Sequence, residues 1–260
     1  MITISGNTLL YPDQIENKGE KMRRNSIPTM SMLLLLAASV SAQMRAYVVV
    51  GFQGPVELVV TDSQGHRSGY NPITKTYYDE IPYAGYGAGS DGQPEFGFKR
   101  IVWDTLFSTT YTVQVFGTGN GAFTGDGIAR QTQSGNGKGA RFPVRGVIDS
   151  NQTVTYELNY STDSTITPTM VRVVDPSTTT QDITDLLKLN LITNHGIANS
   201  LQQKMDNAWK QKENGQVSTA GNMVNAFINE VNAQTGKAII KEAAEILLGD
   251  AEQLLKEWNQ

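Results

Sequence analysis

The sequence of 260 residues contains no cysteine and only two histidines, His66 and His195. Without cysteine the chain cannot form a disulfide framework, a thiolate zinc site, a thiol nucleophile or an acylated lipoprotein anchor. Two histidines leave little imidazole for metal binding or acid–base catalysis. We therefore expect no resident metal and no cofactor. The redox compartment stays open, because a chain without cysteine tolerates either one.

Charge is scarce as well, since charged residues make up 18 % of the chain and the formal net charge is -4. No excess of positive charge exists to attract nucleic acid or anionic lipid, and neither is expected as a partner. The 25 glycines, together with many threonines, serines and asparagines, indicate turns and β structure rather than a helical enzyme.

The one compact apolar run is "MLLLLAASV" at residues 32–40, which follows the basic Met22-Arg23-Arg24 and ends in the small residues Val40-Ser41-Ala42. These are the parts of a secretory signal peptide, and the run is too short to span a bilayer. We predict a signal peptide at residues 22–42; a buried core helix is the alternative. The product would be secreted or periplasmic, with no membrane span in the mature chain.

Residues 1–21 do not fit a signal peptide, because Asp13, Glu16 and Glu20 would make its basic region acidic. We interpret them as an upstream mis-start and Met22 as the true start. Lys18-Gly19-Glu20 can be encoded by a purine run that resembles a ribosome-binding site. The nucleotide sequence would test this, and a pyrimidine-rich stretch there would contradict it.

Several segments between residues 43 and 160 alternate apolar and polar side chains with period two, which predicts strands with one buried face. They are residues 56–61, 111–116 and 153–160, and residues 46–52 and 142–148 indicate two more strands. Clusters of Gly, Asn, Asp and Ser separate these segments. About seven or eight strands are expected, which is typical of an antiparallel β-sandwich.

Residues 161–180 have the composition of a linker, because ten of them are Ser or Thr and two prolines lie among them. Within this stretch, Met170–Val174 is interpreted as a last strand or as a clamp against the following unit. We place the boundary near Asp175-Pro176.

Residues 181–260 carry apolar side chains at helical spacing and predict a small antiparallel bundle of three to four helices. Helices are expected at His195–Lys212, from Ser218 to Gln234, and from Ile240 to Trp258. Asp182, Asn194 and Ser218 are the expected N-caps, and Thr235-Gly236 ends the third helix. Trp209 and Trp258 are expected in the core. The fold class is therefore α+β in two segregated domains, a sandwich followed by a bundle.

The helical part also resembles a known family. The segments are "GIANSLQQKMDNAW", "TAGNMVNAFINEVNAQTGKAI" and "EAAEILLGDAEQLL". They look like the FIMAH domain of secreted bacterial and archaeal proteins. That resemblance implies a helical appendage of exported multidomain proteins, for which no reaction is established.

The strand-rich part is similar to β-sandwich accessory modules of secreted bacterial proteins, in particular to pre-peptidase C-terminal domains. The resemblance rests on Thr61-Asp62, Gly65, Gly69-Tyr70-Asn71-Pro72, Glu80-Ile81-Pro82 and the segment "YTVQVFGTGNGAF" at residues 111–123. It implies a module that is mostly non-catalytic.

The candidate binding residues are tyrosines. Five of the ten tyrosines fall in one short stretch of loop-like sequence: Tyr70, Tyr77, Tyr78, Tyr83 and Tyr86. Tyrosines on loops make amphipathic contact surfaces for proteins or sugars. The alternative is that several of them pack under a long loop.

Other polar residues have an ordinary interpretation beside a functional one. His66 lies in a predicted turn, where a solvated histidine is the simpler interpretation. Asp62 and Asp91 in Gly-rich loops could offer oxygens to calcium, although Asp and Gly are common turn residues and no twelve-residue calcium loop is present. Asp79-Glu80 is a carboxylate pair along the chain only.

The sequence contains no catalytic constellation, so we expect no enzyme. The first hypothesis is an exported, non-catalytic protein that binds a secreted or envelope protein, or a glycan. A second is a secreted hydrolase of polysaccharide that uses Asp79, Glu80 or Asp91. A third is a regulatory companion of a neighbouring exported enzyme.

Overall fold

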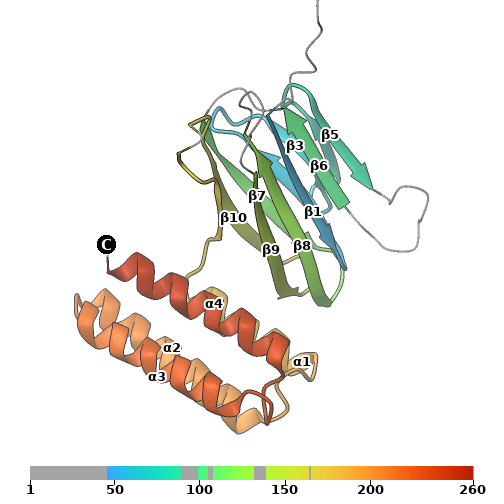
Figure 1. Ribbon diagram of the computed structural model, residues 1–260. Helices are drawn as coiled ribbons and strands as arrows, with labels where there is room; N and C mark the ends of the chain where they lie inside the picture. The colour runs from blue at the N-terminus through green and yellow to red at the C-terminus, as the bar shows by residue number, and fades with distance from the viewer. Residues whose placement is uncertain (1–45, 89–98, 105–107, 132–138, 164, 260) are drawn as a thin grey trace, which may run out of the picture. The chain divides into compact units, whose positions relative to one another are not determined.

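The computed structural model describes residues 46–88, 99–104, 108–131, 139–163 and 165–259 (Figure 1). The predicted mis-start and signal peptide lie outside these described residues. Within them, two antiparallel β-sheets are followed by four helices, and each part has its own hydrophobic core. The α+β class with segregated strands and helices is therefore confirmed.

The strands are β1 (Tyr47–Gln53), β2 (Val56–Thr61), β3 (Arg67–Asn71), β4 (Thr76–Asp79), β5 (Ala84–Ala88), β6 (Lys99–Asp104), β7 (Thr109–Gly117), β8 (Gly121–Arg130), β9 (Gly139–Ile148), β10 (Thr153–Tyr160) and β11 (Thr169–Arg172). One sheet has the order β5-β6-β1-β8-β9 and the other β11-β10-β7-β2-β3-β4. The number of described strands exceeds the expected seven or eight. The short strands β3, β4 and β5 lie in sequence that we interpreted as loops, whereas β11 overlaps Met170–Val174, which we interpreted as a last strand or a clamp.

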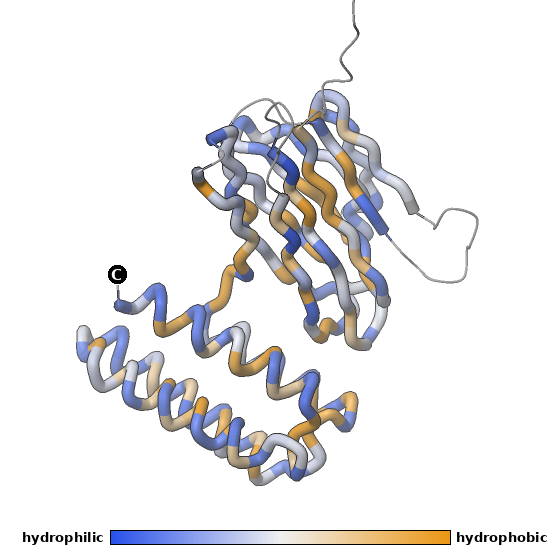
Figure 2. The backbone as a smooth tube through the Cα atoms, viewed as in Figure 1, coloured by the Kyte–Doolittle hydropathy of each residue, from blue (hydrophilic) through white to orange (hydrophobic). Residues whose placement is uncertain are grey.

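The core of the sandwich lies between the two sheets, where apolar side chains of alternate positions meet. Phe52 of β1 is fully buried, and its ring centroid lies 6.0 Å from that of Phe123 in the same sheet. The ring centroid of Phe52 also lies 6.1 Å from that of Tyr156 in the opposite sheet. Figure 2 shows hydrophobic residues along the strands and their alternation with hydrophilic ones along the helices.

The helices are α1 (Pro176–Lys188), α2 (His195–Glu213), α3 (Val217–Gln234) and α4 (Lys241–Trp258). Their buried residues include Leu186, Leu201, Phe227 and Leu247, one from each helix, in one hydrophobic cluster. Helices with one apolar stripe bury it against one another, which is why the helical spacing predicted a bundle. None of the described helices combines the length and the hydropathy that a membrane crossing requires.

Two of the three predicted helix caps are wrong. Asp175, not Asp182, caps α1: its side chain accepts a hydrogen bond from the backbone N–H of Thr178 at 2.7 Å. Asp182 lies inside α1 and is buried. Gln216 precedes α3 without a side-chain cap, so Ser218 lies inside that helix. Asn194 caps α2 as predicted.

The two tryptophans of the helical part, Trp209 and Trp258, differ in burial. Trp258 is buried, as expected, and Lys212 Nζ lies 5.7 Å from the centroid of its ring. Trp209 is 40 % exposed, so its expected place in the core is wrong. It follows the buried Ala208 on α2, and consecutive residues of a helix do not share one face.

The Ser/Thr-rich stretch at residues 161–180 contains regular structure where we expected a linker. Strand β11 pairs with β10, and α1 begins at Pro176 directly after its cap. Arg172 at the end of β11 forms salt bridges with Asp182 of α1 and Asp250 of α4. This stretch therefore connects a sheet to the helices through short, hydrogen-bonded elements.

Candidate binding surface

Three of the five candidate tyrosines form one cluster at an edge of the sandwich. Tyr70 of β3 and Tyr77 of β4 are cross-strand partners, and their rings stack with centroids 4.3 Å apart and planes at 30°. Tyr86 of β5, which belongs to the other sheet, places its ring 6.3 Å from that of Tyr77. We call Tyr70, Tyr77 and Tyr86 the tyrosine cluster.

Charged side chains hold Tyr86 in the cluster. Its hydroxyl donates a hydrogen bond to Oε2 of Glu57 on β2, and Oε1 of Glu57 lies 2.8 Å from Lys99 Nζ. Burial, followed by the hydrogen bond to Glu57, raises the pKa of Tyr86. The phenol therefore stays neutral and keeps its hydrogen on the bond to the carboxylate.

Tyr78 points away from the cluster, because successive side chains of a strand lie on opposite faces. The Arg67 guanidinium lies 3.9 Å from the centroid of the Tyr78 ring. Arg67 also binds Glu80, with 3.3 Å between Nη2 and Oε1. Tyr78 thus belongs to a separate cation–π and salt-bridge group.

Tyr83 lies in the turn between β4 and β5 with a φ of 60°, the left-handed region. Its side chain is 83 % exposed and Tyr77 is 72 % exposed. Among the described residues these are the two most exposed large hydrophobic side chains, and both come from the predicted set. The tyrosines therefore do not all pack under a loop. Apart from Tyr83, they lie on strands, which corrects the expected loop position.

The other sequence-predicted candidates form local contacts. Asp62 accepts hydrogen bonds from the backbone N–H groups of Gln64 and His66 and lies 3.0 Å from His66 Nδ1. This pattern is an ordinary Asx-type turn. The hydrogen bond from Arg67 holds the pKa of Glu80 below its ordinary value, and Asp79 is exposed. Asp91 lies outside the described residues.

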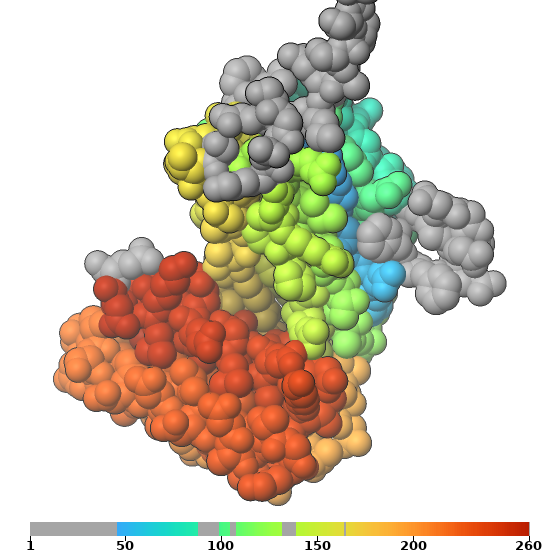
Figure 3. All heavy atoms as spheres, viewed as in Figure 1, coloured from blue at the N-terminus to red at the C-terminus, as the bar shows by residue number. Residues whose placement is uncertain are grey.

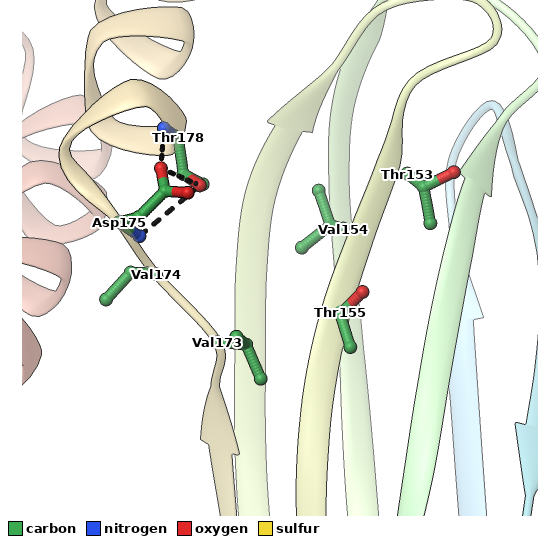
Figure 4. Close-up of a pocket in the computed structure, with 7 residues that line it drawn as sticks. All are labelled: Thr153, Val154, Thr155, Val173, Val174, Asp175 and Thr178. Atoms are coloured by element: carbon green, nitrogen blue, oxygen red, sulfur yellow. Dashed lines mark hydrogen bonds between the residues drawn. The ribbon is translucent and has the colours of Figure 1, made fainter.

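Metal ligands and pockets among the described residues are the remaining features. They contain no group of three or more His, Cys, Asp or Glu side chains that could hold a metal. A shallow pocket between β10 and the start of α1 is lined mainly by threonines and valines (Figure 4). Its one carboxylate belongs to Asp175 and is engaged by Thr178 in the helix cap. On the face seen in Figure 3, the helical side chains coloured orange and red form a continuous surface without a deep hollow.

Sequence reasoning missed the residues that support the tyrosines. Glu57 lies in the alternating segment "VELVV", where a single charge looks like an ordinary solvent-facing position. Its contacts with Tyr86 and Lys99 join residues that are far apart along the chain. Only the pairing of β5 with β6, and the proximity of β2, brings them together.

The comparison with family models concerns the helices. Residues 177–256 match the model of the FIMAH domain. This segment is a FIMAH domain. The match includes nearly all of α1–α4 and does not extend to the sandwich. No curated protein and no solved structure was found to match the chain.

The structure accounts for the residues that suggested the FIMAH domain in the sequence. Phe227 and Val231 of α3 are fully buried, as are Leu201 and Met205 of α2. Gly236 has a φ of 76° directly after Thr235, the C-cap of α3, where glycine is the residue of least strain. The motif of this domain is thus largely its core and one helix stop.

Proposed function

We propose that the chain is an exported, non-catalytic binding protein whose sandwich contacts a secreted or envelope protein, or a glycan, through the tyrosine cluster. The FIMAH domain would act as an accessory unit for attachment or spacing. The observation that carries this proposal is the tyrosine cluster, a stacked aromatic group built on strands of both sheets, in which Tyr77 is exposed and Tyr70 and Tyr86 are half-buried.

Tyrosine suits this task for physical reasons. Its ring gives a large contact area at a low cost in side-chain entropy, and its hydroxyl forms hydrogen bonds at the rim of a contact. Strand-borne rings that stack on each other are already ordered before binding, so less entropy is lost on association. The proposed likeness of the sandwich to pre-peptidase C-terminal modules agrees with a binding role.

The hydrolase alternative has weaker support. Glycoside hydrolysis needs two carboxyl groups across a cleft, one of them an acid with a raised pKa. Glu80 shows the opposite electrostatics, because Arg67 lowers its pKa. The regulatory-companion hypothesis is compatible with the tyrosine cluster, since an enzyme could itself be the bound protein.

The binding proposal is tested by exchanging Tyr77. We expect Tyr77→Ala to weaken binding by about 2 kcal/mol, roughly 30-fold in Kd, because exposed aromatic anchors are typical interface hot spots. The partner is first captured from the culture of the producing organism by crosslinking, and purified candidates and a glycan array are then compared for wild type and variant. Trp209→Ala, which removes an exposed aromatic from the FIMAH domain, is the matched control. Equal binding by the Tyr77 variant and the wild type would refute a role for the cluster.

Export is tested separately. If residues 22–42 are a signal peptide, the secreted protein begins at Gln43, and N-terminal sequencing of the protein from the medium or periplasm identifies that residue. An intact N-terminus on protein recovered from the cytoplasm would contradict export without bearing on the tyrosine cluster.

A further inference from the structure

Strand β4 is the last strand of the six-stranded sheet, so one row of its backbone groups has no partner strand among the described residues. The register shows which groups these are. The backbone N–H of Glu80 donates to the carbonyl oxygen of Arg67 at 2.8 Å, and opposite residues of an antiparallel pair alternate between hydrogen-bonded and non-hydrogen-bonded. Tyr77 and Asp79 lie an odd number of residues before Glu80, at non-hydrogen-bonded positions opposite β3. Their backbone N–H and C=O groups therefore point away from β3, toward the open edge.

Exposed apolar side chains gather along this edge. Tyr77 of β4, Ile73 in the turn before it and Tyr83 in the turn after it are all exposed. They are three of the seven exposed large hydrophobic side chains among the described residues, and they fall within one short segment. Clustered apolar exposure of this kind is typical of a contact surface rather than of a solvated edge.

Two charges of opposite sign stand at the two ends of β4. Lys75, directly before the strand, and Asp79, its last residue, are both exposed, and no ion pair of either is found among the described residues. When a strand pairs antiparallel with a copy of itself, its two ends meet. With Tyr77 opposite Tyr77 of a second copy, Lys75 of each copy lies opposite Asp79 of the other. This charge complementarity selects a second copy as the occupant of the edge.

The same register continues a row of aromatic rings. Tyr70 and Tyr77 are cross-strand partners with stacked rings, and pairing through Tyr77 adds the same two rings from the second copy. Aromatic pairs on neighbouring strands stabilise a sheet. The outward backbone groups of Tyr77 match this register, because two opposed residues of an antiparallel pair can exchange both hydrogen bonds. The side chain and the backbone of Tyr77 thus favour the same pairing.

Edge strands are commonly protected against such pairing by charge, proline or short length. Strand β9, an edge of the five-stranded sheet, is protected in this way. It contains Pro143 between Arg141 and Arg145, and an antiparallel copy centred on the proline would place like charges opposite each other. Strand β4 contains no proline, and the charges at its ends attract a copy. Its four residues limit the strength of the contact but do not prevent it.

We propose that the chain forms a twofold symmetric homodimer through β4, with Tyr77 of one copy opposite Tyr77 of the other. The two six-stranded sheets then form one continuous sheet, and the two tyrosine clusters lie side by side across the symmetry axis. Because the paired strands are short, the dimer is weak, with a Kd of roughly 10–100 µM. The dimer goes beyond the proposed binding function and needs no external partner.

Sedimentation velocity on the full chain, in the form that the producing cell makes, is the direct test. Over a protein concentration from about 1 µM to about 1 mM, the weight-average mass should rise from that of one chain toward that of two. A protein that stays monomeric over this range overturns the proposal.

Lys75→Asp and Asp79→Lys test the register. Each single variant places like charges opposite each other twice in the dimer, so its Kd should rise by at least about tenfold. An equimolar mixture of the two variants should recover the wild-type Kd, because the mixed dimer again pairs opposite charges at both contacts. Lys210→Asp, the same charge change at an exposed position of α2, should leave the dimer unchanged. A dimer that both single variants retain, or a mixture that does not recover, overturns the pairing of β4.

The fold of each variant is checked by its Tm. Lys75 has a φ of 55°, a left-handed conformation that Asp tolerates better than most residues. Asp79 is exposed. Neither exchange should therefore lower the Tm by more than about 2 °C. Recovery of the dimer in the mixture also shows that both variants are folded.

The charge variants keep all five candidate tyrosines, so dimer formation and external binding are measured separately. Loss of the dimer in both variants supports the pairing of β4 whether or not the external partner still binds. Equal external binding by Tyr77→Ala, which refutes the binding role of the cluster, leaves the outcome of the charge exchanges unchanged.

Discussion

Replacing Arg172 with alanine is expected to lower the free energy of unfolding by about 3–5 kcal/mol, the usual cost of breaking a buried ion pair from one side. The Arg172 guanidinium lies between two buried carboxylates. Its Nη2 donates to Asp182 Oδ1 at 3.0 Å and its Nη1 to Asp250 Oδ1 at 2.9 Å. Without the arginine, at least one carboxylate stays buried and uncompensated. Urea unfolding at neutral pH measures the loss.

The same cluster predicts a pH dependence. Burial raises the pKa of Asp250 well above the ordinary 3.8; Arg172 opposes this shift and Asp182 adds to it. Tyr156 of β10 also faces the cluster, and burial raises its pKa. The folded protein therefore keeps a proton on Asp250 that the unfolded chain has released.

The direction in which stability changes with pH follows from that extra proton. Above about pH 4, stability should fall as pH rises, by up to about 1.4 kcal/mol per pH unit, until the raised pKa of Asp250 is passed. Asp250→Asn keeps the shape of the side chain and removes the titration, so it should flatten this slope. The penalty of Arg172→Ala should also shrink in acid, where the Asp250 carboxyl group is neutral. A variant whose penalty does not change with pH would contradict a buried charge as the cause.

Gly69→Ala is the second change with a large expected effect, a loss of at least about 3 kcal/mol. Gly69 of β3 has a φ of 123°, and a Cβ there would lie 2.1 Å from the carbonyl oxygen of Leu58 and 3.0 Å from Ile101 Cδ1. Backbone strain and steric overlap therefore add. The neighbouring β2 strand cannot move aside without opening the pairing of Val59 with Gly69.

Loss of this pairing should also affect binding. Gly69 precedes Tyr70 and pairs with Tyr78, so a displaced β3 moves the stacked rings of Tyr70 and Tyr77. Gly65→Ala is the matched control, because Gly65 also has a positive φ of 88° but has no atom within 4 Å of the added Cβ. Gly65→Ala should lose stability through backbone strain alone. Chemical unfolding of both variants therefore separates the cost of backbone strain from the cost of the steric overlap at Gly69. Equal losses would show that the contact with Leu58 costs nothing.

The repeating elements could be predicted from the sequence because their signals are local. Alternation around Val56–Val60 and Tyr111–Val115 identified strands, and helical spacing around Phe227 identified α3. The wrong predictions concern residues whose position depends on tertiary contacts rather than on neighbouring residues of the sequence. Asp182 looks like a cap, yet Asp175 occupies that place and Asp182 lies in a buried ion cluster. Trp209 looks like a core residue although it lies beside the apolar stripe.

The candidate binding residues were found as a set but not as an arrangement. A cluster of tyrosines along the chain was visible, whereas nothing local separated Tyr78, under Arg67, from Tyr77, which stacks on Tyr70. Neighbours on a strand point to opposite faces, so the register of β3 with β4 makes that distinction. Tyr86 joins the group from a different sheet.

By itself the sequence determined that a strand-rich part precedes a helical part, the FIMAH domain and the segment that holds the tyrosines, because periodicity and motif depend on neighbouring residues. Only the tertiary structure decided which side chains meet. It brings Arg172 to Asp182 and Asp250, and Gln131 to the carbonyls of Ser161, Asp163 and Ile166. Such contacts join positions up to 78 residues apart. They depend on strand register and helix packing, which many sequence positions set together.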